Sequence, residues 1–88
     1  MPLDQAAISP MDRGFLFGDG VYEVMARVDG RVRAKSLHQQ RLAASLASIQ
    51  LDVSVEQIFH DVDRLIEKAN LESAKIYVQV TRGAVAVR

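Results

Sequence analysis

Arg41 is the residue whose side chain and position best suit the binding of an anion. It lies in the run HQQRL, next to Leu42, whose side chain should point into the core. A guanidinium close to a buried helix face can grip a phosphate or a carboxylate through two parallel hydrogen bonds. The alternative is a surface arginine whose aliphatic stem lies over apolar neighbours, and spacing alone favours that alternative.

Tyr22 and Glu23 directly follow the glycine-rich segment Gly18-Asp19-Gly20. There the tyrosine hydroxyl could orient a substrate and the carboxylate could serve acid–base chemistry, while two glycines let the backbone approach a ligand closely. The segment lacks the other glycines of a dinucleotide fingerprint and the Lys-Ser/Thr pair of a P-loop. On local grounds alone, a tight turn leading into a strand, with the tyrosine used for packing, is the simpler explanation.

Further polar candidates are the arginines near the C-terminus and the two histidines. Thr81-Arg82-Gly83 and Arg88 place two cations at the end of a predicted strand, where substrate anions commonly bind. Neither His38 nor His60 has a third ligand at metal spacing, so we expect His60 on a solvated helix face and His38 at a helix start, bonded to backbone. The chain has no cysteine, which excludes disulfides, thiolate metal sites and a cysteine nucleophile.

A β-hairpin is predicted to carry Tyr22 and Glu23. Asp29-Gly30 separates two runs that favour strands, and both turn residues tolerate the positive φ of a type I′ turn. The hairpin strands therefore cover about 21–28 and 31–35. Residues 1–20 are rich in proline and glycine, and we expect extended chain and turns there, with DRGFLFGDG as a structured loop rather than a helix.

Two helices follow the hairpin. Capping-box pairs precede both of them: Ser36 with Gln39, and Ser54 with Gln57. The first helix covers about 37–49, and the second ends at Asn70 and keeps the 3.6-residue apolar period throughout. Their inner faces carry Leu42, Leu46 and Ile49, then Val55, Ile58, Phe59, Val62, Leu65, Ile66 and Ala69.

The last predicted element is a strand over the run AKIYVQVTRG, which ends at Gly83. Its faces alternate, with Ile76, Val78 and Val80 on one side and Tyr77, Gln79 and Thr81 on the other. The order is thus β-hairpin, two helices and a further strand, which indicates an α+β fold with a small antiparallel layer. Residues 1–88 suffice for a single small domain. So thin a sheet leaves one face that needs a second domain or subunit to cover it.

Composition narrows the class of protein. Hydrophobic residues make up 49% and charged residues 25% of the chain, which is typical of a globular domain. Eleven basic residues balance eleven acidic ones, so nothing in the composition supports nucleic-acid binding. No apolar run approaches the roughly 20 residues of a membrane span, and the N-terminus has no signal-peptide pattern. We therefore expect a cytoplasmic protein that binds neither nucleic acid nor membrane.

Three separated motifs, ISPMDRGFLFGDGVYEV, HQQRLAASLASIQL and IYVQVTRG, occur in an order and spacing that match one family. The chain resembles the N-terminal domain of class IV (fold-type IV) pyridoxal-phosphate-dependent aminotransferases over nearly its whole length. Its GDG-VYE form is similar to the D-amino-acid (D-alanine) aminotransferase group. Branched-chain aminotransferases usually carry Phe-Glu-Gly at this point, and aminodeoxychorismate lyases often have Phe in place of Tyr22.

The resemblance implies roles for three residues. Arg41 matches the arginine that holds the phosphate of pyridoxal 5'-phosphate, and Tyr22 matches the tyrosine that helps bind the substrate carboxylate. Arg88 matches the arginine that follows the TRG motif and pairs with that carboxylate, although four residues rather than three separate it from Gly83. The implied reaction transfers an amino group between a D-amino acid and a 2-oxo acid, in a homodimer whose cofactor lies between two domains.

The resemblance also implies that the catalytic residues lie elsewhere. In the family, the Schiff-base lysine and the glutamate facing the pyridine nitrogen belong to a C-terminal domain, and Lys35, Lys68 and Lys75 match no such position. The chain corresponds to about the first third of an enzyme, starting late and stopping early, and we expect it to be inactive alone. The alternatives are an aminodeoxychorismate lyase, a branched-chain aminotransferase, and a non-catalytic remnant or interaction module that uses its exposed sheet face.

Overall fold

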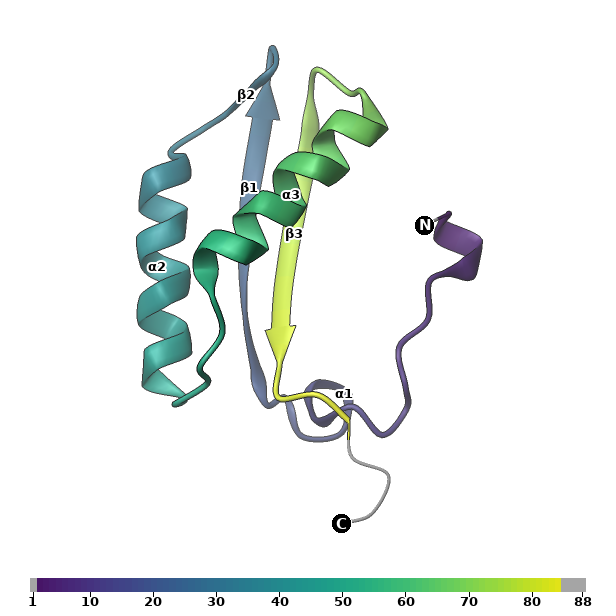
Figure 1. Ribbon diagram of the computed structural model, residues 1–88, viewed down its shortest axis with the longest axis vertical. Helices are drawn as coiled ribbons and strands as arrows, with labels where there is room; N and C mark the ends of the chain where they lie inside the picture. Colours follow the sequence, from purple (N-terminus) through teal and green to yellow (C-terminus); the bar gives the residue numbers. More distant parts are fainter. Residues whose placement is uncertain (1, 85–88) are drawn as a thin grey trace.

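The computed structural model describes residues 2–84, in which two longer helices lie on one face of a three-stranded antiparallel sheet (Figure 1). The α+β fold expected from the sequence is confirmed. In chain order the elements are η1 (Leu3–Gln5), a short 3-10 helix, α1 (Arg13–Phe17), β1 (Gly20–Val28), β2 (Arg31–Val32), α2 (Lys35–Ser48), α3 (Val55–Ala69) and β3 (Ala74–Thr81).

The central strand of the sheet is β1, in the order β2-β1-β3. It pairs with β3 along its length, from Gly20 opposite Thr81 to Arg27 opposite Ala74. Pairing with β2 is limited to the hairpin end. The predicted turn is confirmed, since φ is 50° at Asp29 and 81° at Gly30, as a type I′ turn requires.

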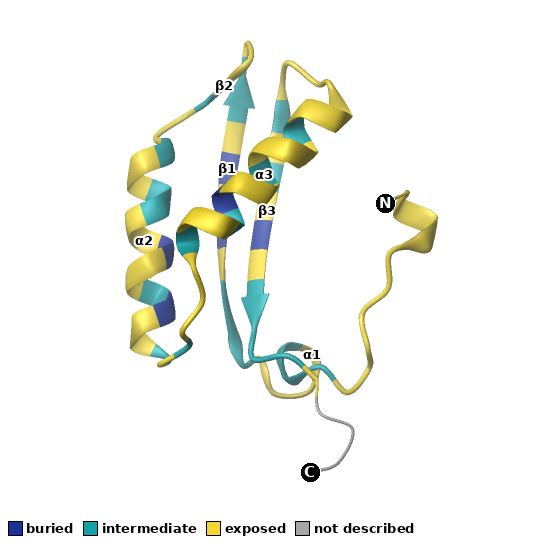
Figure 2. Ribbon diagram, viewed as in Figure 1, coloured by how far each residue is buried: buried dark blue, intermediate teal, exposed yellow. Residues whose placement is uncertain are grey.

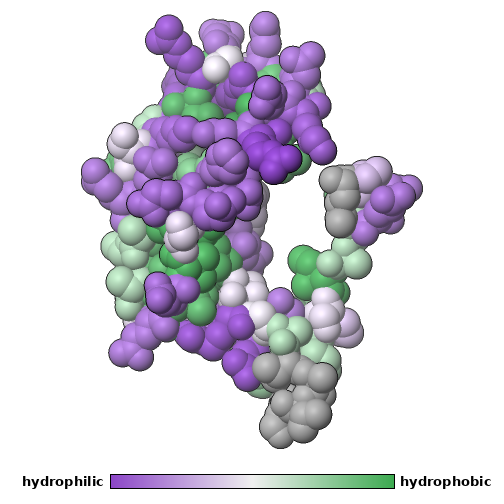
Figure 3. Space-filling model, viewed as in Figure 1, coloured by the Kyte–Doolittle hydropathy of each residue, from purple (hydrophilic) through white to green (hydrophobic). Residues whose placement is uncertain are grey.

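The core lies between the sheet and the helices. Strand alternation turns Met25 and Val78 toward the helices, where they meet buried side chains of α2 and α3: Leu42, Leu46 and Phe59. Figure 2 shows these buried positions on the facing sides of the elements. On the helix side seen in Figure 3, hydrophilic side chains cover much of the surface, and apolar atoms show between them.

The opposite face of the sheet is exposed, as the sequence predicted for so thin a layer. Tyr22 and Tyr77 are 60% and 58% exposed, and Val24 is also exposed. The two tyrosine rings stack, with centroids 5.5 Å apart and planes within 2°. We call this surface of Tyr22, Val24 and Tyr77 the open sheet face.

The hairpin exit and the start of α2 differ from the prediction. The second hairpin strand was expected over 31–35, but β2 ends at Val32. Ala34 adopts the left-handed conformation, with φ at 51°, and α2 begins at Lys35. Ser36 therefore lies inside the first turn of the helix, and the predicted capping box with Gln39 is wrong.

Residues 13–17 form the short helix α1, where the sequence predicted a loop. Asp12 caps it by accepting a hydrogen bond from the Gly14 amide at 2.8 Å, and Gly18 ends it with φ at 64°. A tertiary contact holds the turn, because the Arg13 amide donates to the Gly83 carbonyl at 2.9 Å. Local sequence does not reveal such a contact, which explains the missed helix.

The second predicted helix is confirmed, with Ser54 accepting from the Gln57 amide and Asn70 ending it at a φ of 51°. Its last turns are less covered than expected. Leu65 is 64% exposed and Ala69 is exposed, although both were predicted on the inner face. The reason is geometric, since α3 runs toward the side of β3, which is an edge strand of the described sheet (Figure 1).

Two serines test these cap assignments. Ser54→Ala should lower the free energy of unfolding by about 1 kcal/mol, because it removes the cap of α3. Ser36→Ala should change it by less than about 0.5 kcal/mol, because an alanine inside a helix turn loses no cap bond. Urea unfolding followed by circular dichroism measures both. An equal loss in the two variants would contradict the observed start of α2.

Candidate functional site

Glu23 is the one buried charged side chain among the described residues, at 5% exposure. It belongs to the helix-facing side of β1, between the inward positions Val21 and Met25, and both its oxygens meet α2. The Nδ1 atom of His38 lies 2.6 Å from Oε1, and a guanidinium nitrogen of Arg41 lies 3.6 Å from Oε2. Burial of a carboxylate is tolerable only with such partners, so β1 and α2 are joined here.

His38 differs from its sequence-based interpretation. It was expected to bond backbone at the start of a helix, but it lies one turn into α2 and contacts the Glu23 carboxylate. The sequence held a usable signal for this contact. Residues three apart share a helix face, as His38 and Arg41 do, and Glu23 alternates with apolar inward residues.

Arg41 faces two environments. One nitrogen is directed at the buried carboxylate, yet its side chain is 60% exposed. An arginine has five N–H donors, so most of this guanidinium remains available to an anion at the surface of α2. The described structure therefore gives Arg41 the properties that a phosphate-binding group requires.

Tyr22 lies on the other side of β1, on the open sheet face. Its cross-strand neighbour Gln79 lines a hollow of about 480 Å³, together with Ile8, Phe15 and Thr81. This volume is in the range of small-molecule sites. Among the described residues, Tyr22 and Arg41 share no hydrogen bond or ion pair, and the adjacent positions Tyr22 and Glu23 connect the two candidate groups.

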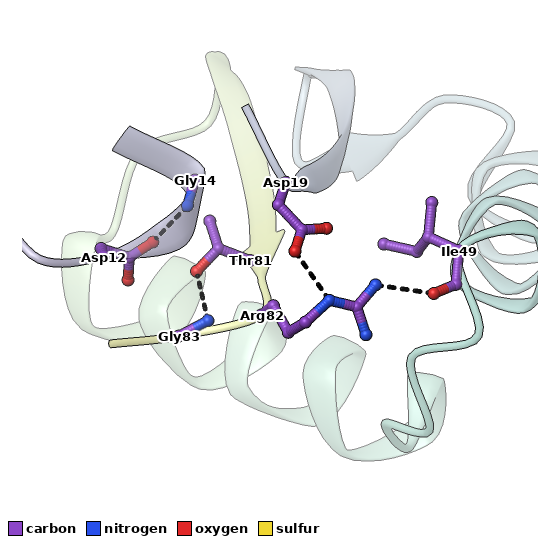
Figure 4. Close-up of polar contacts among 7 residues, drawn as sticks. All are labelled: Asp12, Gly14, Asp19, Ile49, Thr81, Arg82 and Gly83. Atoms are coloured by element: carbon purple, nitrogen blue, oxygen red, sulfur yellow. Dashed lines mark hydrogen bonds and ion pairs between the residues drawn. The ribbon is translucent and has the colours of Figure 1, made fainter. Parts of the chain in front are cut away.

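Arg82 fastens the end of β3 to two distant segments (Figure 4). Its Nε donates to Asp19 Oδ2 at 2.7 Å, and a terminal nitrogen donates to the Ile49 carbonyl at 2.7 Å. The Arg82 amide also donates to the Asp19 carbonyl at 3.1 Å. The cation expected to attract substrate at this strand end is thus engaged in holding the loop before β1 and the end of α2.

The glycines around this clamp serve close packing. A Cβ atom at Gly20 would lie 2.7 Å from the Val80 carbonyl oxygen, and one at Gly14 would collide with the Thr81 side chain. The segment Gly18-Asp19-Gly20 is therefore a tight connection into β1, the simpler of the two explanations offered by its sequence.

Two sequence-based candidates remain, Arg88 and His60. Arg88 lies outside the described residues, and its role stays a prediction. His60 is exposed on α3, as expected. Within residues 2–84, no cluster of three or more His, Asp or Glu side chains suits a metal ion. No helix in this part of the chain is long and apolar enough to cross a membrane.

The fold is that of known aminotransferase structures. The Escherichia coli branched-chain amino acid aminotransferase superposes with a TM-score of 0.88 at 24% identity, over 100% of this chain and 31% of that one. The 4-amino-4-deoxychorismate lyase of Pseudomonas aeruginosa gives 0.79 at 28% identity, over 91% and 29%. A fold IV transaminase of Curtobacterium pusillum gives 0.77 at 26%, over 99% and 32%.

Sequence comparison agrees with the fold. The model of the family described as amino-transferase class IV matches residues 20–87, and the chain belongs to this family. The D-alanine aminotransferase of Staphylococcus haemolyticus is 38% identical over 82 residues, which is 91% of this chain. The chain spans about 29% of the length of that relative. The resemblance to class IV aminotransferases of the D-alanine group is thus confirmed.

The forked contacts of Arg82 predict a specific loss of stability. Arg82→Lys should lower the free energy of unfolding by about 1–2 kcal/mol, because an ammonium cannot reproduce the guanidinium fork to Asp19 and Ile49. Asp63→Asn is the control, since the Lys35–Asp63 pair is exposed and worth at most about 0.5 kcal/mol. Urea unfolding measures both. A loss in Arg82→Lys no larger than in the control would contradict the clamp.

Proposed function

We propose that this chain forms the N-terminal, cofactor-phosphate-binding part of a class IV aminotransferase that transfers an amino group between a D-amino acid and a 2-oxo acid. The observation that carries the proposal is Arg41, an exposed guanidinium that has one nitrogen directed at buried Glu23 and its other donors open. Family membership gives such a group an evident ligand in the phosphate of pyridoxal 5'-phosphate.

The residues present fit that ligand. A phosphate dianion favours an arginine that can offer two parallel donors, and the exposure of Arg41 leaves room for them. When bound, the cofactor supplies an electron sink for chemistry at the α-carbon of an amino acid. Arg41 contributes by anchoring and orienting its phosphate, without any proton transfer of its own.

Tyr22 is proposed to orient the substrate carboxylate. Its ring is held against Tyr77 on the open sheet face, so the hydroxyl is carried by a strand rather than by a loop. A phenolic O–H donates well to a carboxylate. Arg88 is proposed as the second partner of that carboxylate.

The D-amino-acid preference is favoured over the two alternatives within the family. It draws on the 38% identity to a D-alanine aminotransferase and on tyrosine rather than phenylalanine at position 22. The same reasoning extends to a cytoplasmic homodimer in which the open sheet face is covered by the rest of the enzyme. Catalysis would then need a lysine outside this chain, since Lys35, Lys68 and Lys75 match no Schiff-base position of the family.

Phosphate binding at Arg41 can be measured on the 88-residue chain. Pyridoxine 5'-phosphate is a suitable probe, because it lacks the aldehyde that would react with lysines. Titration followed by isothermal calorimetry, which reads wild type and variant alike, should show saturable binding, and Arg41→Gln should weaken it at least about tenfold, the loss expected for a charge-assisted bond. Arg64→Gln, on the exposed side of α3, is the control. Equal affinity in wild type and Arg41→Gln would refute this role.

Substrate preference requires a complete active site. A hybrid in which this chain replaces the matching part of the S. haemolyticus D-alanine aminotransferase should transaminate D-alanine in preference to L-leucine. Tyr22→Phe in that hybrid should lower kcat/KM about 10- to 100-fold, chiefly through KM, because a hydrogen bond to the carboxylate is lost. Preference for L-leucine would instead favour the branched-chain alternative.

A further inference from the structure

We propose that Glu23 and His38 are positioning residues for Arg41, holding its guanidinium ready for a phosphate. This inference rests on the proposed function, because it concerns how the same phosphate site is oriented. It assigns a purpose to the one buried charge that the described residues contain. The three side chains come from only two elements, β1 and α2.

The two oxygens of Glu23 have separate partners. Oε1 lies 2.6 Å from His38 Nδ1, and Oε2 lies 3.6 Å from Arg41. An ionised carboxylate only accepts hydrogen bonds, so Nδ1 is the donor. The short contact fixes the carboxylate plane, which in turn determines where Oε2 meets the guanidinium.

Burial decreases outward along this chain of contacts. Exposure of the side chains is 5% for Glu23, 15% for His38 and 60% for Arg41. The inner pair is shielded from water, so the negative charge that Arg41 faces is poorly screened. A long arginine side chain that would otherwise sample many rotamers is thereby drawn toward one orientation, which reduces the entropy lost when an anion binds.

Two physical effects predict opposite changes in phosphate affinity when Glu23 is neutralised, so the direction of the change tests the proposal. Glu23 is negative and close to the anion site, so Coulomb's law alone predicts that its neutralisation tightens phosphate binding. Loss of orientation predicts the opposite. A contact that merely fastens β1 to α2 predicts lower stability with no specific change in affinity.

The test is titration of the 88-residue chain with pyridoxine 5'-phosphate. Glu23→Gln should weaken binding about 3- to 10-fold, although it removes a repulsive charge. His38→Gln, which keeps the charge of Glu23 but removes the imidazole, should also weaken binding. Asp63→Asn is the matched control, because it removes one negative charge that also contacts α2, at Lys35, and it should leave affinity unchanged.

Unchanged or tighter binding in Glu23→Gln, with Arg41→Gln still defective, would overturn the positioning role and leave the phosphate role of Arg41 standing. No saturable binding in wild type, or no defect in Arg41→Gln, would overturn both. A measurement on the wild type alone keeps the proposal testable if the variants fail to fold. In ¹⁵N relaxation, Arg41 Nε–H should be clearly more ordered than Arg64 Nε–H, and equal mobility on the picosecond-to-nanosecond timescale would also overturn the proposal.

Discussion

The buried carboxylate of Glu23 is the constraint on which the arrangement of sheet and helices depends. A charge on the core side of a strand is costly unless polar groups meet it, and here both come from one face of α2. That requirement fixes the rotation of the helix. Once His38 and Arg41 face Glu23, the neighbouring face of α2 places Leu42 and Leu46 in the core beside Met25. The polar contact and the apolar packing are thus two results of one helix orientation.

Sequence reasoning succeeded where the signal is local and periodic. The second long helix was predicted from its apolar period, its serine cap and Asn70, and α3 occupies that span. Alternation likewise predicted the two faces of β3. Sequence reasoning failed where the local structure depends on a distant contact or on an unfavourable backbone conformation. The short helix α1 is held by Gly83, and the early start of α2 follows from the left-handed Ala34, which no propensity favours.

The candidate site was visible only in part. Spacing alone favoured a plain surface role for Arg41 and a packing role for Tyr22. The family resemblance instead implied ligand-binding roles for both residues. Geometry adds a physical reason at Arg41, which faces a buried charge and solvent at once. Geometry also shows that Arg82, at the end of β3, is engaged in the fold through Asp19 and Ile49. The sequence carried a signal for the contact of Glu23 with His38, in the helix face that His38 shares with Arg41, but the two residues are fifteen positions apart and the structure was needed to pair them.

The pairing of β1 with β3 also sets the order in which this chain can acquire its structure. β1 ends at Val28 and its long partner begins at Ala74, so β1 can pair with β3 only after all of α2 and α3 has been synthesised. At about 5–20 residues per second, that interval lasts several seconds. During it, the apolar side of β1 has α2 as its nearest available cover. Early docking of that helix through Glu23 would shield a nascent strand that otherwise invites association with other chains.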